Sequence, residues 1–494
     1  MVEVELKFLI DPRDREALAR CAALAGAKPR RARIDTTYFD TAEGELAARG
    51  LALRLRLAGG RWIEGLKAGE SGTGGLHARA EWEHARSDPG IDLALYANTP
   101  LARLHDTARL HERLAPAFRV VMTRTTWLIA DGAGSRLEVA LDVGEIHARG
   151  RSEALAEVEI ECQEGASAAA FDLAARMLDE VRLRPSAVSK AERGWRLCRA
   201  ERPVPVKARP AGVRRDATPG AAARQVIAAG LAQLQANEEG LLEASDPEFV
   251  HQARIALRRL RAALRIFRDT IGPERARAWR EELGEIARAL GLARDWDVFA
   301  TETLPPVLSV YGDAALAREL RRQVERRRNA ARAQAREALG SARYAHAVLQ
   351  LARWLAQADE PAAPQRQLRK FASRVLRKRH DRLLGQAADP ASLSLEERHR
   401  LRIEAKRLRY GTDALASLFD ARRVTRYLDA LSRLQDALGR SNDAATAMRL
   451  LQDLDAPQPF SAYARAVFAV RARSDPALLR GLVGRLRAAR PWRG

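Results

Sequence analysis

Cysteine, aromatic residues and long apolar segments are all scarce in this chain of 494 residues. The three cysteines, Cys21, Cys162 and Cys198, are widely spaced and odd in number, so they predict neither a disulfide framework nor a cysteine-based metal cluster. No apolar run reaches the roughly 18 residues that a membrane-spanning helix needs, so we expect no membrane partner. The chain opens on a charged segment rather than the apolar stretch of a secretory signal, so we expect a cytoplasmic protein.

Acidic residues are also in deficit. The 64 Asp and Glu residues face 85 Lys and Arg residues, and the net charge is +21. Such a surplus predicts attraction to a polyanion or an anionic surface. Because aromatic residues make up only 5% of the chain, few side chains are left for stacking on unpaired bases. We therefore expect a polyanion without bases rather than nucleic acid, with a generally basic surface as the alternative.

The composition changes near residue 200. Before that point, short segments of alternating polar and apolar residues are separated by turn signals, which predicts an antiparallel sheet or barrel of about eight strands with flanking helices. The segments are 1–10, 34–40, 51–57, 61–69, 78–84, 118–130, 136–146 and 155–162. Helical patterns at 11–26 and 167–181 interrupt them.

The opening segment, MVEVELKFLI, shows a pattern that recurs along this half. As a strand it places alternate apolar residues on one face and Glu3, Glu5 and Lys7 on the other. For a single strand, a polar face that meets water is the better interpretation. Eight such strands closed into a barrel would instead line its interior with mixed charge. Basic side chains there would hold phosphates. The acidic side chains would repel the phosphates unless a divalent cation is shared between the carboxylates and the phosphate oxygens, so we predict Glu3 and Glu5 as metal ligands.

After residue 200 the pattern becomes helical. Residues 201–220 are rich in Pro and Gly and are predicted to form a linker, and residues 221–494 consist of long helical segments. Within them HQARIALRRLR (251–261) matches HRLRIEAKRLR (399–409), and ALGLARD (289–295) matches ALGRSND (437–443). Both matches have the same offset in residue number, 148, and no gap. We therefore expect an all-α domain of two related halves about a pseudo-twofold axis.

The repeated helix carries a basic stripe, because basic residues recur at every third or fourth position and so share one face. The stripe comprises His251, Arg254, Arg258, Arg261 and Arg265 in the first copy and His399, Arg402, Lys406 and Arg409 in the second, and a third basic helix adds Lys370, Arg374, Arg377 and His380. Such like charges repel one another within a helix, whereas arginine forks suit phosphate oxygens. We interpret the stripe as a surface for a phosphate-rich polymer, with a merely solvated face as the alternative.

The repeated motif H..RI..[RK]RLR, followed by LG..[RN]D, resembles the CHAD domain, the conserved histidine α-helical domain, over residues 221–494. This resemblance implies a pseudo-symmetric helical bundle that binds inorganic polyphosphate and is not itself an enzyme.

In the first half, EVELKF carries an ExExK signature, followed in order by YFDT, LALRLR, GLKAG, AEWE, EVALDVG, EIE and SKAERG. Over residues 1–200 this set resembles the CYTH domain of the triphosphate tunnel metalloenzymes. The resemblance implies an eight-stranded antiparallel tunnel that hydrolyses a triphosphate with Mg²⁺ or Mn²⁺. The resemblance implies that the metal ligands are Glu3, Glu5, Glu159 and Glu161, with Asp142 and Glu81 as helpers. It implies that the catalytic residues that hold the phosphates are Lys7, Arg54, Arg56, Lys67, Arg124 and Lys190. Further substrate contacts would come from Arg119 and Arg193. Glu157 is an additional acid to which the motif assigns no role.

The two domains in this order resemble the bacterial two-domain inorganic triphosphatases, whose partners would be inorganic triphosphate and polyphosphate. Two alternatives stay open. One is a binding protein of polyphosphate granules with a weak or vestigial tunnel. The other is the same tunnel acting on an organic triphosphate, as an adenylate cyclase or a thiamine triphosphatase, although no apolar subsite for a base stands out in residues 1–200. The choice of metal, the cleavage of long polyphosphate, the oligomeric state and coupling between the domains stay open as well.

Overall fold

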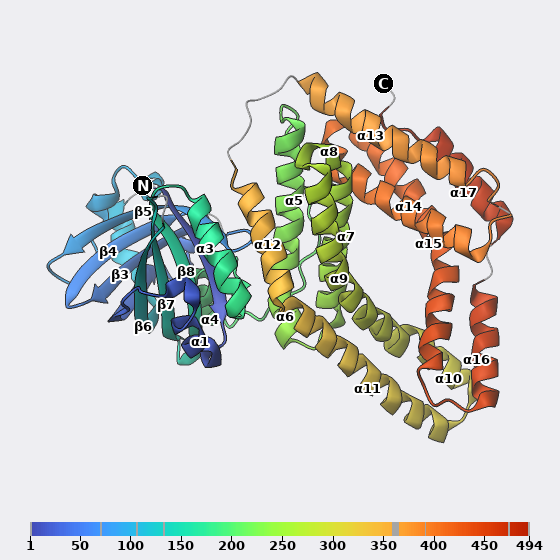
Figure 1. Cartoon of the computed structure of the whole chain (residues 1–494), viewed down its shortest axis with the longest axis horizontal. Coiled ribbons are helices and arrows are strands. Elements are labelled where there is room, and N and C mark those ends of the chain that lie inside the picture. Colours follow the sequence, from blue (N-terminus) through green and yellow to red (C-terminus); the bar gives the residue numbers. More distant parts are fainter. Residues whose placement is uncertain are drawn as a thin grey trace. The chain divides into compact units, whose positions relative to one another are not determined.

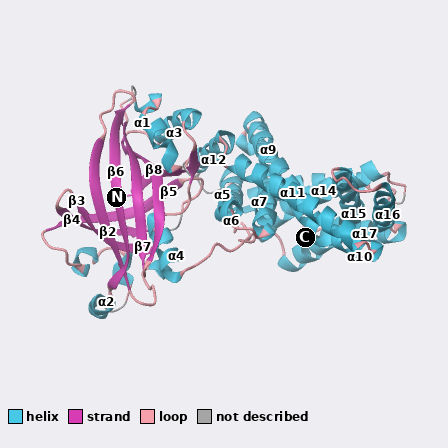
Figure 2. Cartoon of the chain, turned by 90° about the horizontal axis from the view of Figure 1, so that it is seen from below, coloured by secondary structure: helices cyan, strands magenta, loops and turns pink. Residues whose placement is uncertain are grey.

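The computed structural model describes residues 2–69, 72–104, 107–131, 134–357, 365–390, 392–472 and 475–492. These residues form two compact units (Figure 1). The first unit contains the residues up to Pro203 together with Gly340–Gln357, and the second contains Val204–Leu339 and the residues after 357. The strands lie in the first unit and the second is helical (Figure 2). The expected fold class is thereby confirmed. Among the described residues, no helix is both long and apolar enough to span a membrane.

Eight antiparallel strands of the first unit close into a barrel. Their order is β5-β4-β3-β2-β6-β7-β8-β1, and β1 also pairs with β5, which completes the ring. The short β9 pairs with the far end of β1. The strands are β1 (Val2–Ile10), β2 (Arg30–Asp40), β3 (Leu51–Ala58), β4 (Arg61–Ala68), β5 (Leu76–Arg86), β6 (Ala115–Ala130), β7 (Arg136–Ala148), β8 (Arg151–Glu164) and β9 (Leu183–Pro185).

The alternation of side chains decides which face of each strand meets the barrel interior. On β1, Leu6, Phe8 and Ile10 are buried in the apolar core outside the barrel, whereas Glu5 and Lys7 line the interior. The helices that accompany the barrel in this half of the chain are α1 (Arg15–Ala19), α2 (Thr107–Arg113), α3 (Ala168–Glu180) and α4 (Lys190–Arg199). The helix α3 covers the apolar face of β1 and β8, and α4 packs against β6 and β7.

The first unit also contains a helix from far along the chain. The helix α12 (Ala342–Leu355) packs against α3 and β9, and Figure 1 shows it near α3. Its Ala345, Leu349 and Ala352 belong to the same apolar core as Phe8 of β1 and Phe171 of α3. The arrangement follows from the amphipathic pattern of α12, whose apolar residues recur at three- and four-residue spacing. The core of the first unit is therefore built from two distant stretches of sequence.

The second unit consists of helices. They are α5 (Pro219–Ala236), α6 (Glu238–Glu243), α7 (Pro247–Ile266), α8 (Arg268–Ile271), α9 (Pro273–Val298), α10 (Leu304–Tyr311), α11 (Ala314–Leu339), α13 (Gln365–Gln386), α14 (Leu395–Ala414), α15 (Ala421–Gln452), α16 (Gln458–Arg471) and α17 (Pro476–Ala488).

The repeat is visible in the bounds of these helices. In the register of the repeated motifs, both ends of α7 correspond to the ends of α14, because Pro247 pairs with Leu395 and Ile266 pairs with Ala414. The first residue of α9 corresponds in the same way to the first residue of α15. The two halves of the unit therefore repeat the same helices at matching positions.

We expect Leu349→Ala to lower the free energy of unfolding of the first unit by about 2–4 kcal/mol, because the deletion leaves a cavity in a closed apolar core. The matched control is Gln350→Ala, the next residue of α12, whose side chain is exposed and whose replacement should change stability by less than about 0.5 kcal/mol. Urea unfolding of the full chain, followed by circular dichroism in the near ultraviolet, measures both. Equal effects of the two substitutions would contradict the assignment of α12 to this core.

Candidate active site and basic surface

A cavity of about 610 Å³ lies within the barrel. Its cationic side chains come from several separate elements of the first unit, and acids alternate with them around the wall. The cations are Lys7, Arg54, Arg56, Lys67, Arg79, Arg124 and Lys190, and the acids are Glu5, Glu81, Glu83, Glu159 and Glu161. A cavity lined in this way suits a small polyanion together with a cation of high charge density.

The register of β1 and β8 places their charged residues side by side. In the pair formed by β1 and β8, Glu5 lies opposite Glu161 and Lys7 lies opposite Glu159. The register therefore brings the carboxylates of Glu5, Glu159 and Glu161 to one part of the wall, with Lys7 among them. Glu3 lies in β1, two residues before Glu5, and its side chain is outside the described residues.

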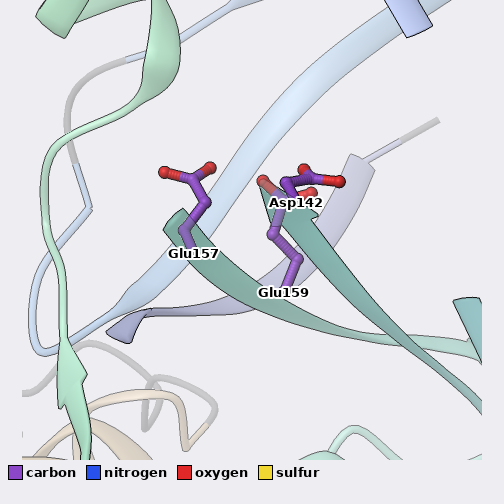
Figure 3. Close-up of side chains that lie close together, drawn as sticks. All are labelled: Asp142, Glu157 and Glu159. Carbon is purple, nitrogen blue, oxygen red and sulfur yellow. The ribbon is translucent and has the colours of Figure 1, made fainter. Parts of the chain in front are cut away.

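Three carboxylates form a compact cluster next to this wall. One oxygen from each of Asp142, Glu157 and Glu159 lies within 4.8 Å of the others, and Figure 3 shows these side chains projecting from β7 and β8. Asp142 and Glu157 are fully buried and do not line the cavity, whereas Glu159 does. The cluster therefore sits partly beneath the cavity wall.

The cluster is neutralised by the cations around it. Nζ of Lys7 donates to Oε1 of Glu157 at 2.9 Å and to Oε1 of Glu159 at 2.5 Å. Nζ of Lys190 lies 2.7 Å from Oδ2 of Asp142 and 2.8 Å from Oε1 of Glu159, and it also pairs with Glu157. These contacts hold both ammonium groups at the cavity wall.

The guanidinium of Arg124 completes the cluster. It donates to both oxygens of Asp142, at 2.7 and 2.6 Å, and to Oε2 of Glu159 at 2.6 Å. Arg124 and Asp142 are direct neighbours in the pairing of β6 with β7, so the bidentate contact follows from the register.

The ion pairs of the cluster shift the pKa values of Glu159 and Lys7. Burial disfavours the carboxylate form of Glu159, yet Lys190, Lys7 and Arg124 outweigh burial and hold its pKa well below the ordinary value. Burial likewise opposes the charge of Lys7, but Glu157, Glu159 and Glu5 hold the pKa of Lys7 well above its ordinary value. These groups therefore remain ionised throughout the neutral pH range.

A second group of charges lies on another part of the wall. Nη2 of Arg54 donates to Glu81 at 2.5 Å and to Glu83 at 2.8 Å, and Nζ of Lys67 lies 3.0 Å from Oε2 of Glu81. Arg56 is less well compensated, because its ion pair with Glu83 is 3.7 Å long. Burial and the nearby Arg54 and Arg124 lower the pKa of Arg56 to about 10. An anion beside Arg56 would therefore relieve repulsion among cations.

In each half of the second unit, the first arginine of the repeated helix lies against the LG..[RN]D motif of the same half. The guanidinium of Arg254 in α7 lies over Gly291 of α9, where a Cβ atom would collide with it, and Nη1 lies 3.9 Å from Oδ1 of Asp295. In the second copy Arg402 lies near Gly439, and its Nη2 lies 3.5 Å from Oδ1 of Asp443. The small residue and the acid of the LG..[RN]D motif thus accommodate the arginine of the repeated helix.

The two copies of the basic stripe also approach each other, because α7 packs against α14. Burial, followed by the charges of Arg258, Arg402 and Arg254, lowers the pKa of Lys406 to about 7. Burial and Arg258 lower the pKa of Arg254 to about 10. Cations of both halves therefore share one surface and repel one another there.

The family comparisons agree with this division of the chain. Residues 1–195 match the family model of the CYTH domain, and residues 225–452 match that of the CHAD domain. A solved CHAD domain from the plant Ricinus communis is 31% identical, with a TM-score of 0.50, and the match covers 58% of this chain and 98% of that one. The chain belongs to the CHAD family, and its residues 1–195 match the CYTH domain. The resemblance stated from the sequence motifs is thereby confirmed.

The CYTH domain also has a curated relative. An inorganic triphosphatase from Haemophilus influenzae is 29% identical over 197 residues, which cover 40% of this chain and 54% of that protein. This chain thus matches about half the length of that relative. A solved structure of a putative adenylyl cyclase from Hippeastrum is 20% identical over 41% of this chain and 98% of that one, with a TM-score of 0.31, too low to add to the assignment.

The structure brings most of the predicted CYTH residues into the cavity, but not all of them. Arg119 points away from the cavity and pairs with Asp35, because the inward-facing residues of β6 are Val120, Met122 and Arg124, of opposite parity. Arg193 does not line the cavity: it donates to Glu153 and to the carbonyl of Ala154, and its Nη1 lies 3.8 Å from Oε2 of the buried Glu157.

Two further residues of the cavity wall were given no role from the sequence. Arg79 and Glu83 line the cavity beside Glu81 on β5. The two-residue period of the strand places both on the same face as Glu81, but only Glu81 belongs to the motif that the resemblance assigns.

The CHAD domain presents part of its predicted basic set at the surface. Lys370, Arg374 and Arg377 of α13 are exposed. His380 is fully buried, and its Nδ1 lies 2.7 Å from the hydroxyl of Tyr427. The reason is helical spacing, since His380 lies four residues after the buried Leu376 and therefore falls on the apolar stripe of α13.

The remaining predicted histidines and Arg409 have polar surroundings. His251 is half-buried, and burial followed by Arg294 lowers its pKa. Nδ1 of His399 lies 2.9 Å from Oδ1 of Asn442, and Arg409 is exposed and donates to Gln435 at 3.4 Å.

We expect Asp142→Asn to lower the free energy of unfolding of the first unit by about 2–4 kcal/mol, because it leaves buried cations with too little negative charge. Asp35→Asn is the matched control, since Asp35 also pairs with an arginine of β6 but does so at the surface, and it should cost less than about 1 kcal/mol. Chemical denaturation of the two variants measures the difference. A loss at Asp142 no larger than at Asp35 would contradict a buried charge cluster.

Proposed function

We propose that the CYTH domain hydrolyses inorganic triphosphate in its barrel with the help of a divalent cation, and that the CHAD domain binds inorganic polyphosphate. The observation that carries the first part is the convergence of cations and carboxylates from separate strands in one cavity. The inorganic triphosphatase of Haemophilus influenzae, which is related to the CYTH half, supports the same substrate class.

The cations of the cavity suit a linear chain of phosphates. Lys7, Arg124 and Lys190 occupy one part of the wall, and Arg54, Arg56 and Lys67 occupy another, so bound phosphates would meet positive charge on both sides. Guanidinium groups bind phosphate oxygens in a bidentate manner, and lysines act as point charges. Arg56 gains most from such a ligand, because its repulsion from Arg54 and Arg124 would be offset.

The carboxylates suit a hard divalent cation such as Mg²⁺ or Mn²⁺. Glu5, Glu159 and Glu161 are oxygen donors on adjacent positions of β1 and β8, and they face the same cavity as the phosphate-holding cations. We assign these residues as metal ligands, with Glu3 and Glu81 as further candidates. When bound, such a cation neutralises phosphate oxygens and lowers the pKa of an attacking water.

The protein side chains would contribute position and charge. Asp142 and Glu157, which lie beneath the wall, hold Lys7, Lys190 and Arg124 in place before substrate arrives. Phosphoryl transfer needs little covalent help from a protein, so prepositioned cations around the triphosphate account for much of the expected rate enhancement. This division assigns Asp142 to positioning rather than to the metal, and it gives a role to Glu157.

We expect Glu5→Gln to lower phosphate release from tripolyphosphate by about 100-fold or more, because a neutral amide is a poor ligand for Mg²⁺. Glu145→Gln is the control, since Glu145 is exposed on the outer face of β7 and should leave the rate unchanged. Chelation of divalent cations should abolish the wild-type rate.

Assays with ATP and thiamine triphosphate in parallel test the organic alternatives. A wild-type rate of turnover in Glu5→Gln would refute the tunnel assignment.

The second part of the proposal rests on the basic surface shared by α7 and α14. Arg254, Arg258, Arg402 and Lys406 crowd together there, and burial followed by the repulsion among these cations lowers the pKa values of Arg254 and Lys406. A polyphosphate chain would remove the repulsion by supplying closely spaced negative charge. Association with polyphosphate granules would follow from the same surface.

We expect reversal of Arg254, Arg258 and Arg402 to Glu to abolish polyphosphate binding by the full chain while tripolyphosphate hydrolysis continues. Reversal of Arg318, Arg321 and Arg326, which are exposed on α11, changes the net charge equally and should weaken binding by no more than about threefold, as expected for distant, screened charges. Electrophoretic retardation of polyphosphate measures both variants. Equal losses would mean that net charge alone, and not this surface, attracts the polymer.

A further inference from the structure

The repeat allows each contact between the two halves of the CHAD domain to be compared with its counterpart. Arg259 of α7 forms a salt bridge with Asp413 of α14. In the register of the repeat, Arg259 corresponds to Arg407 and Asp413 corresponds to Arg265. The counterpart of a salt bridge is therefore a pair of arginines, so the symmetry of the repeat is broken at this contact.

The two arginines of the counterpart are electrostatic neighbours. Burial, followed by the charges of Arg407, Arg280 and Arg379, lowers the pKa of Arg265 to about 10. Nη2 of Arg379 donates to the backbone oxygen of Arg265 at 3.3 Å, which places a third guanidinium beside the pair. Arginines from α7, α9, α13 and α14 thus gather on this side of the domain.

The gathered arginines have little negative charge to balance them. Glu404 pairs with Arg407, and within the described residues no salt bridge joins Arg265 or Arg280 to an acid. The half-buried Arg261 lies one turn before Arg265, and burial together with Arg280, Arg288 and Arg407 lowers its pKa. Like charges held together in this way lower stability unless an anion neutralises them.

The second half lacks a counterpart of this cluster. The residue that corresponds to Arg280 of α9 is Leu428 of α15, and the residue that corresponds to Arg265 is the acidic Asp413. At these two positions the first half therefore offers a polyanion positive charge, whereas the second half offers an acid and an apolar residue. On the other side Arg259 is already neutralised by Asp413.

We infer that polyphosphate follows a one-sided path on the CHAD domain, from the surface shared by the two stripes over Arg265, Arg280 and Arg407, and not over the corresponding residues Asp413, Leu428 and Arg259. This inference rests on the proposed binding of polyphosphate by the CHAD domain. The inference gives the bound polyphosphate a direction, because only a polyphosphate longer than the shared surface would reach the additional arginines. Long chains should therefore bind more tightly than short ones by an amount that depends on this cluster.

The test is Arg265→Asp in the full chain, which gives the first half the residue found at the corresponding position of the second. We expect the affinity for long-chain inorganic polyphosphate to fall about tenfold or more, the loss of a charge-assisted contact, and its dependence on salt to become weaker. Tripolyphosphate hydrolysis should not change. Arg426→Asp is the matched control, since Arg426 is exposed on α15 close to Leu428 and carries the same change in charge, and it should alter the affinity by less than about threefold.

The outcomes separate this inference from the proposed function. If the wild-type chain does not bind polyphosphate, the proposed function of the CHAD domain fails. If the wild type binds but Arg265→Asp retains its affinity, or loses no more than Arg426→Asp, the one-sided path is wrong. Circular dichroism checks that Arg265→Asp is folded. Should it not fold, Arg280→Gln removes charge from the same cluster without a reversal and is expected to weaken long-chain binding as well.

Discussion

The compensation of charge inside the barrel is the interaction on which the rest of the CYTH domain depends. Lys7, Lys190 and Arg124 can be buried together only because Asp142, Glu157 and Glu159 neutralise them at hydrogen-bonding distance. Under the proposed function, metal ions and phosphates would replace contacts that the side chains already make with one another. The stability of the barrel therefore depends on the same charge pattern of the strands that lines the cavity.

Much of the fold and part of the site follow from periodicity. The alternation of polar and apolar residues predicted the barrel and the inward position of Glu5 and Lys7, and the internal repeat anticipated the matching bounds of α7 and α14. The failures have the same origin, because a period alone does not say which face is buried. Arg119 has the wrong parity on β6, and His380 falls on the apolar stripe of α13.

Contacts between distant segments were beyond the sequence pattern. The salt bridge of Arg259 with Asp413, and its replacement by two arginines in the other half, depends on how α7 meets α14. The two halves thus agree in the residues that support the helices, such as Gly291 and Gly439, and differ in the charges at their contact. Duplication supplied a scaffold of two similar halves, and substitution at single positions distinguished them.

The packing of α12 on the barrel has a consequence for synthesis on the ribosome. The core around Leu349 also contains Leu6 from the start of the chain, so the amino-terminal half cannot complete its core when it first emerges. It must wait until the chain has been extended through Gln357, while α5–α11 are already available to fold. In this protein the unit that comes first in the sequence can complete its core only after the first half of the helical unit has been synthesised.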